Sequence, residues 1–122
     1  ALREPLTDYL VRQGFAVSQA ASAAEARSRL REEVPDLVLL DIMMPGRSGI
    51  EILKEVRASK KVAISEISVI MITAKSQVAD IDEALDAGAT SYIVKPFRAE
   101  ALIEKVQTLL PVPVKINAIK ES

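Results

Sequence analysis

The sequence predicts an α/β fold in which helices cover both faces of a parallel sheet. Three short apolar runs, at residues 37–40, 69–72 and 92–94, are each bounded by turn residues, and a weaker run covers residues 15–17. Their hydrophobicity is continuous rather than alternating, which is typical of strands buried on both faces. Helical patterns lie between these runs, and this alternation implies a parallel sheet with right-handed crossovers.

The helical patterns have recognisable ends. Five helices are expected, over residues 5–13, 23–33, 49–58, 77–87 and 98–110. Ser22, followed by Glu25, forms a capping box at the start of the second helix. Gly88 suits the end of the fourth helix, and Pro111 ends the fifth. The connection over residues 59–68 is long, and we expect an ordered surface loop there, with a functional insert as the alternative.

Composition excludes several classes of function. The chain has 122 residues, 27% of them charged, with a net charge of −1 and no cysteine or histidine. One domain is expected. Disulfides, thiol nucleophiles, Ser-His triads and imidazole metal sites are excluded. The near-neutral charge argues against direct binding of nucleic acid. No apolar run approaches the roughly 18 residues of a membrane span, and no segment resembles a signal peptide, so we expect a cytoplasmic protein without membrane contact.

Three reactive side chains follow three of the predicted strands. Asp41, Thr73 and Lys95 each come directly after an apolar run. In open parallel sheets, ligands bind beyond the carboxyl ends of the strands. A carboxylate can accept a phosphoryl group as a nucleophile, while a hydroxyl and an ammonium can bind its oxygens. Each residue alone is more often a capping, turn or solvated residue, but the three together favour a phosphoryl site. The Lys95-Pro96 bond is a candidate cis peptide that would aim the lysine into the cleft.

The motifs that contain these residues resemble a known family. PDLVLLDIMMPGRSGIE at residues 35–51, VIMITA at 69–74 and YIVKPF at 92–97 are similar to the receiver domain of bacterial two-component response regulators. Pro45 and Gly49 match a proline and a glycine that follow the phosphoacceptor in that family. The spacing of the three motifs makes the resemblance highly specific.

The resemblance implies a role for each matching residue. Asp41 would accept a phosphoryl group from a sensor histidine kinase or a phosphotransfer protein. Thr73 and Lys95 would bind that group. Thr73 and Tyr92 would move on activation and change the face formed by the fourth helix, fifth strand and fifth helix. Mg²⁺ would be bound by Asp41 and the backbone carbonyl of Met43. Such a domain acts once per signal, so we do not expect an enzyme in the usual sense.

The resemblance also implies an architecture. It covers residues 3–110 and predicts a flavodoxin-like, doubly wound parallel sheet in the strand order 2-1-3-4-5. We expect a receiver domain over residues 1–111 and a C-terminal tail over 112–122. The tail is either a linker to an output domain or a replacement central strand. A homodimer, formed by exchange of a strand, is a further alternative.

The beginning of the sequence departs from the family. Residues 1–4 resemble the start of a helix, so the family's first strand and its acidic pair are expected to be absent there. Burial of a five-residue central strand contributes about 5–10 kcal/mol, which is comparable to the whole stability of a domain, about 5–15 kcal/mol. The central position is then either empty, filled by residues 112–119 in parallel orientation, or filled by a swapped strand.

The missing acidic pair leaves the function open. The Mg²⁺ site is expected to be incomplete, unless Glu121 or Glu4 supplies a second carboxylate. The main hypothesis is a phosphoacceptor switch at Asp41. The alternative is a receiver-like interaction or dimerisation module that is not phosphorylated. A flavin-binding protein is disfavoured, because no hydroxyl-rich phosphate loop follows any strand.

Overall fold

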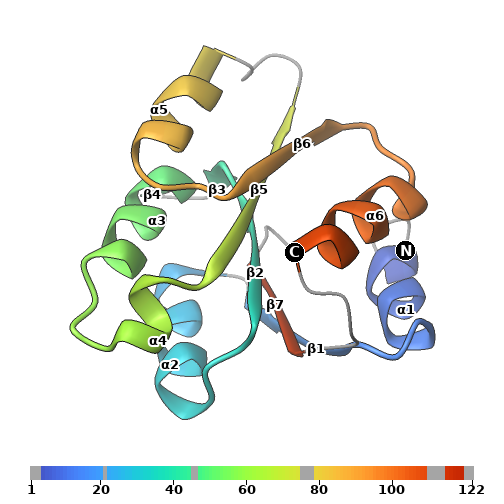
Figure 1. Cartoon of the computed structure of the whole chain (residues 1–122), viewed down its shortest axis with the longest axis horizontal. Coiled ribbons are helices and arrows are strands. Elements are labelled where there is room, and N and C mark those ends of the chain that lie inside the picture. The colour runs from blue at the N-terminus through green and yellow to red at the C-terminus, as the bar shows by residue number, and fades with distance from the viewer. Residues whose placement is uncertain (1–3, 21, 45–46, 75–78, 110–114, 120–122) are drawn as a thin grey trace.

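The computed structural model describes residues 4–20, 22–44, 47–74, 79–109 and 115–119 (Figure 1). Helices and the strands of the main sheet alternate along the chain, as the sequence predicts, and a short strand pair and one extra helical turn are added to this pattern. In order, the elements are α1 (Glu4–Arg12), β1 (Ala16–Ala20), α2 (Ala23–Glu32), β2 (Leu37–Asp41), β3 (Met43–Met44), β4 (Arg47–Ser48), α3 (Gly49–Arg57), α4 (Val62–Ser65), β5 (Ser68–Ala74), α5 (Ile81–Asp86), β6 (Ser91–Lys95), α6 (Ala99–Leu109) and β7 (Lys115–Ile119).

The main sheet has five parallel strands in the order β1-β7-β2-β5-β6. The last strand in the sequence, β7, therefore lies between the first two, as Figure 1 shows. Ile116 is paired with Val17 on one side and Leu37 on the other. Of the alternatives for the central position, filling by the C-terminal segment is confirmed over residues 115–119. An empty position is wrong for this chain, and residues 112–114 lie outside the described part.

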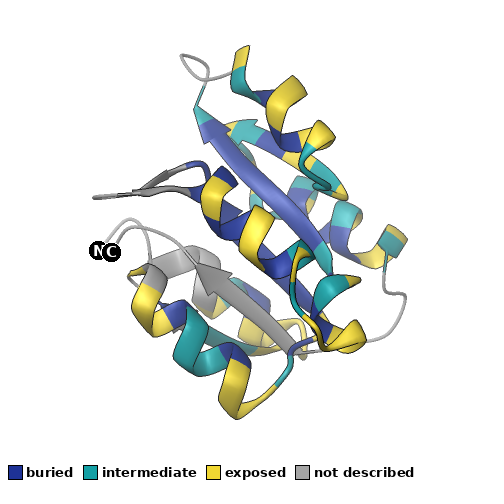
Figure 2. Ribbon diagram, turned by 90° about the vertical axis from the view of Figure 1, so that its left-hand side faces the viewer, coloured by how far each residue is buried: buried dark blue, intermediate teal, exposed yellow. Residues whose placement is uncertain are grey.

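Helices cover both faces of this sheet. Figure 1 shows α1 and α6 on one side and α2, α3, α4 and α5 on the other. Successive residues of β2 belong to different core clusters, since side chains alternate across a strand. Val38 and Leu40 pack with α2 and α3, and Leu37 and Leu39 pack with α1 and α6. Figure 2 shows the buried residues on the helix surfaces that face the sheet. Burial on both faces explains the continuous hydrophobicity of the strands.

Most predicted boundaries agree within one or two residues, but three local features differ. The fourth predicted helix, 77–87, is shorter as α5, and residues 75–78 lie outside the described part. The connection 59–68 is not a plain loop, because it contains the single turn of α4, where Ile64 is buried. The antiparallel pair β3–β4 was not predicted, since two-residue strands leave no hydrophobic pattern. Ser22 caps α2 through a hydrogen bond from the Glu25 amide, as predicted.

Candidate functional site

The carboxyl ends of β2, β5 and β6 meet at one edge of the sheet. Asp41 ends β2, and Lys95 ends β6, with β5 between them. The Lys95 Nζ lies 3.0 Å from Asp41 Oδ1. The carboxylate side chain is 9% exposed, whereas that of Lys95 is 49% exposed. The structure thus brings together the predicted carboxylate and ammonium, with the lysine reaching in from solvent.

Thr73 lies on the strand between these two residues. It precedes the final residue of β5 and is paired with Val94 of β6. Its side chain is completely buried, and its hydroxyl donates a hydrogen bond to the carbonyl oxygen of Ala74 at 3.2 Å. In this structure the hydroxyl is therefore engaged with the backbone at the same edge as Asp41. The Lys95-Pro96 peptide bond is cis, as the sequence predicts.

The chain folds back onto Asp41 immediately after β2. The Ile42 amide donates a hydrogen bond to the Ile72 carbonyl at 3.0 Å, so the pairing of β2 with β5 continues for one residue beyond Asp41. The β3–β4 pair then reverses the chain, and the Gly49 amide donates to the Ile42 carbonyl. A Cβ atom at position 49 would collide with the backbone carbonyl oxygen of Asp41. Glycine is therefore required because the start of α3 approaches the backbone of Asp41, a reason that the sequence resemblance alone did not supply.

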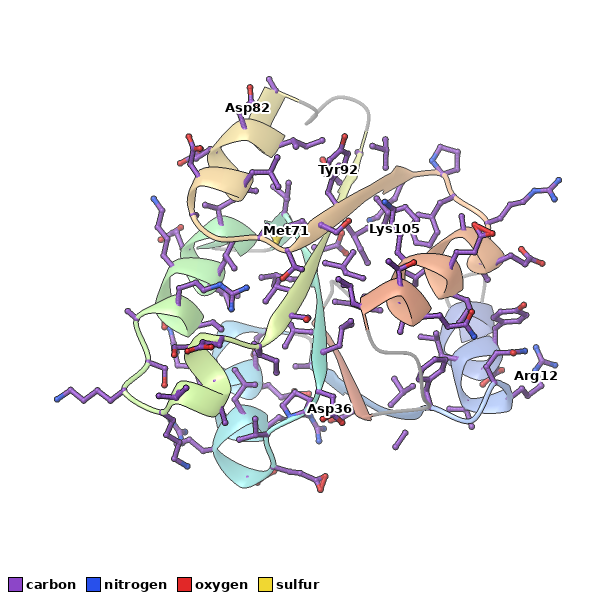
Figure 3. The ribbon with its side chains drawn as sticks, viewed as in Figure 1. Arg12, Asp36, Met71, Asp82, Tyr92 and Lys105 are labelled. Atoms are coloured by element: carbon purple, nitrogen blue, oxygen red, sulfur yellow. The ribbon has the colours of Figure 1, made fainter. Side chains whose placement is uncertain are left out.

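Tyr92 occupies the outer surface of β6. Its side chain is 39% exposed, and the Lys105 Nζ lies 5.8 Å from the centre of its ring, within cation–π range. Figure 3 labels both residues. The same Nζ is 3.5 Å from Ser91 Oγ. Leu85 of α5 is also exposed, so a tyrosine, a leucine and a lysine lie on the elements α5, β6 and α6 that were expected to form the switching face.

The donor set at this edge is of the kind that Mg²⁺ binds, but few donors are described. Asp41 supplies a carboxylate, and the backbone of Met43 lies two residues further on, in β3. Among the described residues, no group of three or more acidic side chains could hold a metal ion. Glu121 and the neighbouring Lys120 lie outside the described part. Glu4 begins α1. The described donors at this edge, a carboxylate and a backbone carbonyl, fit Mg²⁺ in chemistry.

None of the helices in the described part of the chain is long and apolar enough to cross a bilayer.

Comparisons with known proteins agree on the family. The model of the response regulator receiver domain matches residues 1–107. The DNA-binding response regulator MtrA of Mycobacterium tuberculosis (strain ATCC 25618 / H37Rv) is 37% identical over 110 residues, which are 90% of this chain and 46% of that protein. The transcriptional regulatory protein ResD of Bacillus subtilis (strain 168) is 38% identical over 109 residues, 89% of this chain and 43% of that protein. The chain spans less than half the length of these relatives.

Solved structures give the same result. The receiver domain of NtrX from Brucella abortus superposes with a TM-score of 0.81 at 27% identity, covering 91% of each chain. The receiver domain of the response regulator TorR of the TMAO respiratory system superposes with a TM-score of 0.78 at 30% identity, covering 88% of this chain and 86% of that one. The parallel sheet with helices on both faces thus agrees with a family match over residues 1–107, and the chain belongs to the response regulator receiver domain family.

Proposed function

We propose that this chain is a phosphoacceptor switch that receives a phosphoryl group on Asp41 from a sensor histidine kinase or a phosphotransfer protein. The observation that carries the proposal is the 3.0 Å contact between the Lys95 ammonium and the shielded Asp41 carboxylate. Thr73 lies on the strand between them. A nucleophilic carboxylate, a cation and a hydroxyl at one edge are the groups that phosphoryl transfer needs.

The transfer step uses these residues in separate roles. One Asp41 oxygen attacks the phosphorus of a phosphohistidine, the new O–P bond forms, and the P–N bond breaks. The histidine nitrogen keeps the electron pair of that bond and takes a proton from solvent. The Lys95 ammonium offsets the added negative charge, and the Thr73 hydroxyl turns from the Ala74 carbonyl towards a phosphoryl oxygen. Mg²⁺, when bound, would offset further phosphoryl charge, with Asp41, the Met43 carbonyl and either Glu121 or Glu4 as its protein ligands.

Reorientation of Thr73 would alter the packing of Tyr92 and hence the face formed by α5, β6 and α6. Phosphorylation adds charge and acceptor oxygens locally, and it shifts the balance between two arrangements of that face. Residues 1–111 would form the receiver, completed by β7 from the tail. Since relatives are DNA-binding and transcriptional regulators, we propose a cytoplasmic regulator whose output region lies elsewhere in a longer protein.

Intact-protein mass after incubation with acetyl phosphate and Mg²⁺ tests the proposal. We expect the parent chain to gain one phosphoryl group, and the variant Asp41→Asn to gain none. Asp82→Asn, an exposed carboxylate of α5, is the matched control and should behave like the parent. A folded parent chain without the added mass would overturn the proposal.

A second candidate is a receiver-like interaction or dimerisation module that is not phosphorylated. The scarcity of clustered carboxylates among the described residues favours it. Its structural form would be a homodimer in which two chains exchange β7, because β7 is the last strand among the described residues and pairs with both β1 and β2. Light scattering coupled to size-exclusion chromatography distinguishes the two candidates. If the chain is an interaction module, we expect a dimer at micromolar concentration without any phosphoryl donor.

A further inference from the structure

The guanidinium of Arg57 contacts two separate connections of the chain. Arg57 is the last residue of α3. Its Nε donates to the Gly88 carbonyl at 2.9 Å, and its Nη1 donates to the carbonyls of Ser65 and Ile67 at 3.1 and 2.7 Å. Its Nη2 lies 3.5 Å from Thr90 Oγ1. One side chain therefore links the connection that enters β5 to the connection that enters β6.

The two connections also bond to each other at this point. The Thr90 amide donates to the Val69 carbonyl at 2.9 Å, and the Val69 amide donates to Thr90 Oγ1 at 3.0 Å. Arg57 thus lies where the amino-terminal ends of β5 and β6 are joined to α3. This node is at the opposite edge of the sheet from Asp41, and the phosphoryl chemistry does not use it.

Gly88 carries independent evidence that Arg57 is closely fitted. Its φ is +109°, a conformation that favours glycine. A Cβ atom at this position would lie 2.9 Å from Arg57 Nε and 3.0 Å from its Cγ. A side chain at position 88 is therefore excluded both by the positive φ and by the close approach of Arg57.

Arginine is suited to this node because its planar fork presents five donors in fixed directions, whereas a lysine presents a compact ammonium. Burial lowers the pKa of Arg57, because desolvation disfavours its charged form. The cation is held by backbone carbonyls, so its contacts set the position of the backbone itself.

We propose that Arg57 is a positioning residue that ties the α5–β6 connection to α3 and so sets the resting position of the face bearing Leu85 and Tyr92. The functional part of this inference rests on the proposed phosphoacceptor role. The helix α3 starts at Gly49, against the Asp41 backbone, and ends at Arg57, against Gly88. It therefore spans the distance between the phosphoacceptor loop and the segment that leads into β6.

Amide hydrogen exchange of the unphosphorylated chain tests the positioning role. Arg57→Gln should speed exchange at the amides of Val69 and Thr90 at least about tenfold more than at core amides of β2 or α6, because local opening is no longer opposed. Arg57→Lys should give a smaller effect of the same pattern. The control is Lys54→Gln, which removes an exposed α3 cation 3.9 Å from Glu83 of α5 and should leave the pattern unchanged. Equal acceleration at every core amide, or none, would overturn the proposal.

Gly88→Ala provides a variant that keeps the charge of Arg57. The new methyl group collides with the guanidinium stem, so the same local amides should exchange faster. Because alanine also strains the backbone at the positive φ of position 88, Gly88→Ala only supports the result, and Arg57→Lys decides it if Arg57→Gln fails to fold.

The link to switching is tested after treatment with acetyl phosphate and Mg²⁺. Arg57→Gln should form the Asp41 adduct as fully as the parent, while the change in exchange that phosphorylation causes at residues 87–92 falls by half or more. An undiminished change would overturn the link to switching. If the parent forms no adduct, the phosphoacceptor role itself fails, and the exchange of the unphosphorylated variants alone decides whether Arg57 positions this connection.

Discussion

The Lys95 ammonium lies 3.0 Å from the Asp41 carboxylate, with the lysine half exposed and the aspartate shielded. The two residues end strands that are separated by β5 in the sheet. The long lysine side chain crosses that distance, so its ammonium can move without a change of the backbone. An ammonium arranged in this way can move from the carboxylate to the oxygens of a phosphoryl group that is attached to Asp41, where it offsets their negative charge.

Lys95→Met should slow formation of the Asp41 adduct at least tenfold, because the added phosphoryl charge is no longer offset. The free energy of unfolding should fall by only about 1 kcal/mol, since solvent screens a pair with one half-exposed partner. Mass spectrometry over time gives the rate, and urea denaturation gives the stability. Lys54→Met on α3 is the control, and an unchanged rate in Lys95→Met would contradict the assigned role.

Thr73→Val should slow adduct formation about tenfold or more, since one preorganised donor is lost. Valine has nearly the same shape, and the lost hydrogen bond to Ala74 is worth about 1 kcal/mol or less in stability. Thr73→Ser retains the hydroxyl and should restore most of the rate. Equal rates for the valine and serine variants would show that the hydroxyl takes no part.

Gly49→Ala should lower the free energy of unfolding by about 1–3 kcal/mol, because the new methyl group overlaps backbone rather than a flexible side chain. The displaced carbonyl belongs to Asp41, so adduct formation should slow as well. Thermal and urea unfolding measure the first effect. Val62→Ala, at an exposed position of α4, should stay within about 0.5 kcal/mol of the parent. A parent-like Gly49→Ala protein would refute the close approach.

Asn117→Val should raise the free energy of unfolding by about 1–2 kcal/mol, because a β-branched residue is favoured in a strand that has a neighbour on each side. Asn117 is paired with Val38, which is fully buried, and with Ser18. Lys115→Val is the control, since the pairing with β2 begins only at Ile116. A loss of stability in Asn117→Val would mean that the amide is required at this position.

Local pattern was sufficient for the elements whose signal lies within a few residues. Continuous apolar runs located β2, β5 and β6, and the residues that follow those runs are the ones that meet at the carboxyl edge. The short hairpin β3–β4 and the turn of α4 were missed, because they arise from contacts with neighbouring segments rather than from periodicity. The contacts of Arg57 could not be predicted from the sequence either, since three of its four hydrogen-bond partners are backbone carbonyls, which every residue supplies.

The sequence by itself predicted the α/β class, because continuous apolar runs are typical of strands that are buried on both faces. The family followed from the resemblance of the three motifs that contain Asp41, Thr73 and Lys95. The sequence left open what occupies the centre of the sheet. Only the tertiary structure placed β7 between β1 and β2, since pairing in a parallel sheet depends on which open edges remain after the rest of the chain has folded. Non-local packing also brought the end of α3 to the connection between α5 and β6, where Arg57 donates a hydrogen bond to the Gly88 carbonyl.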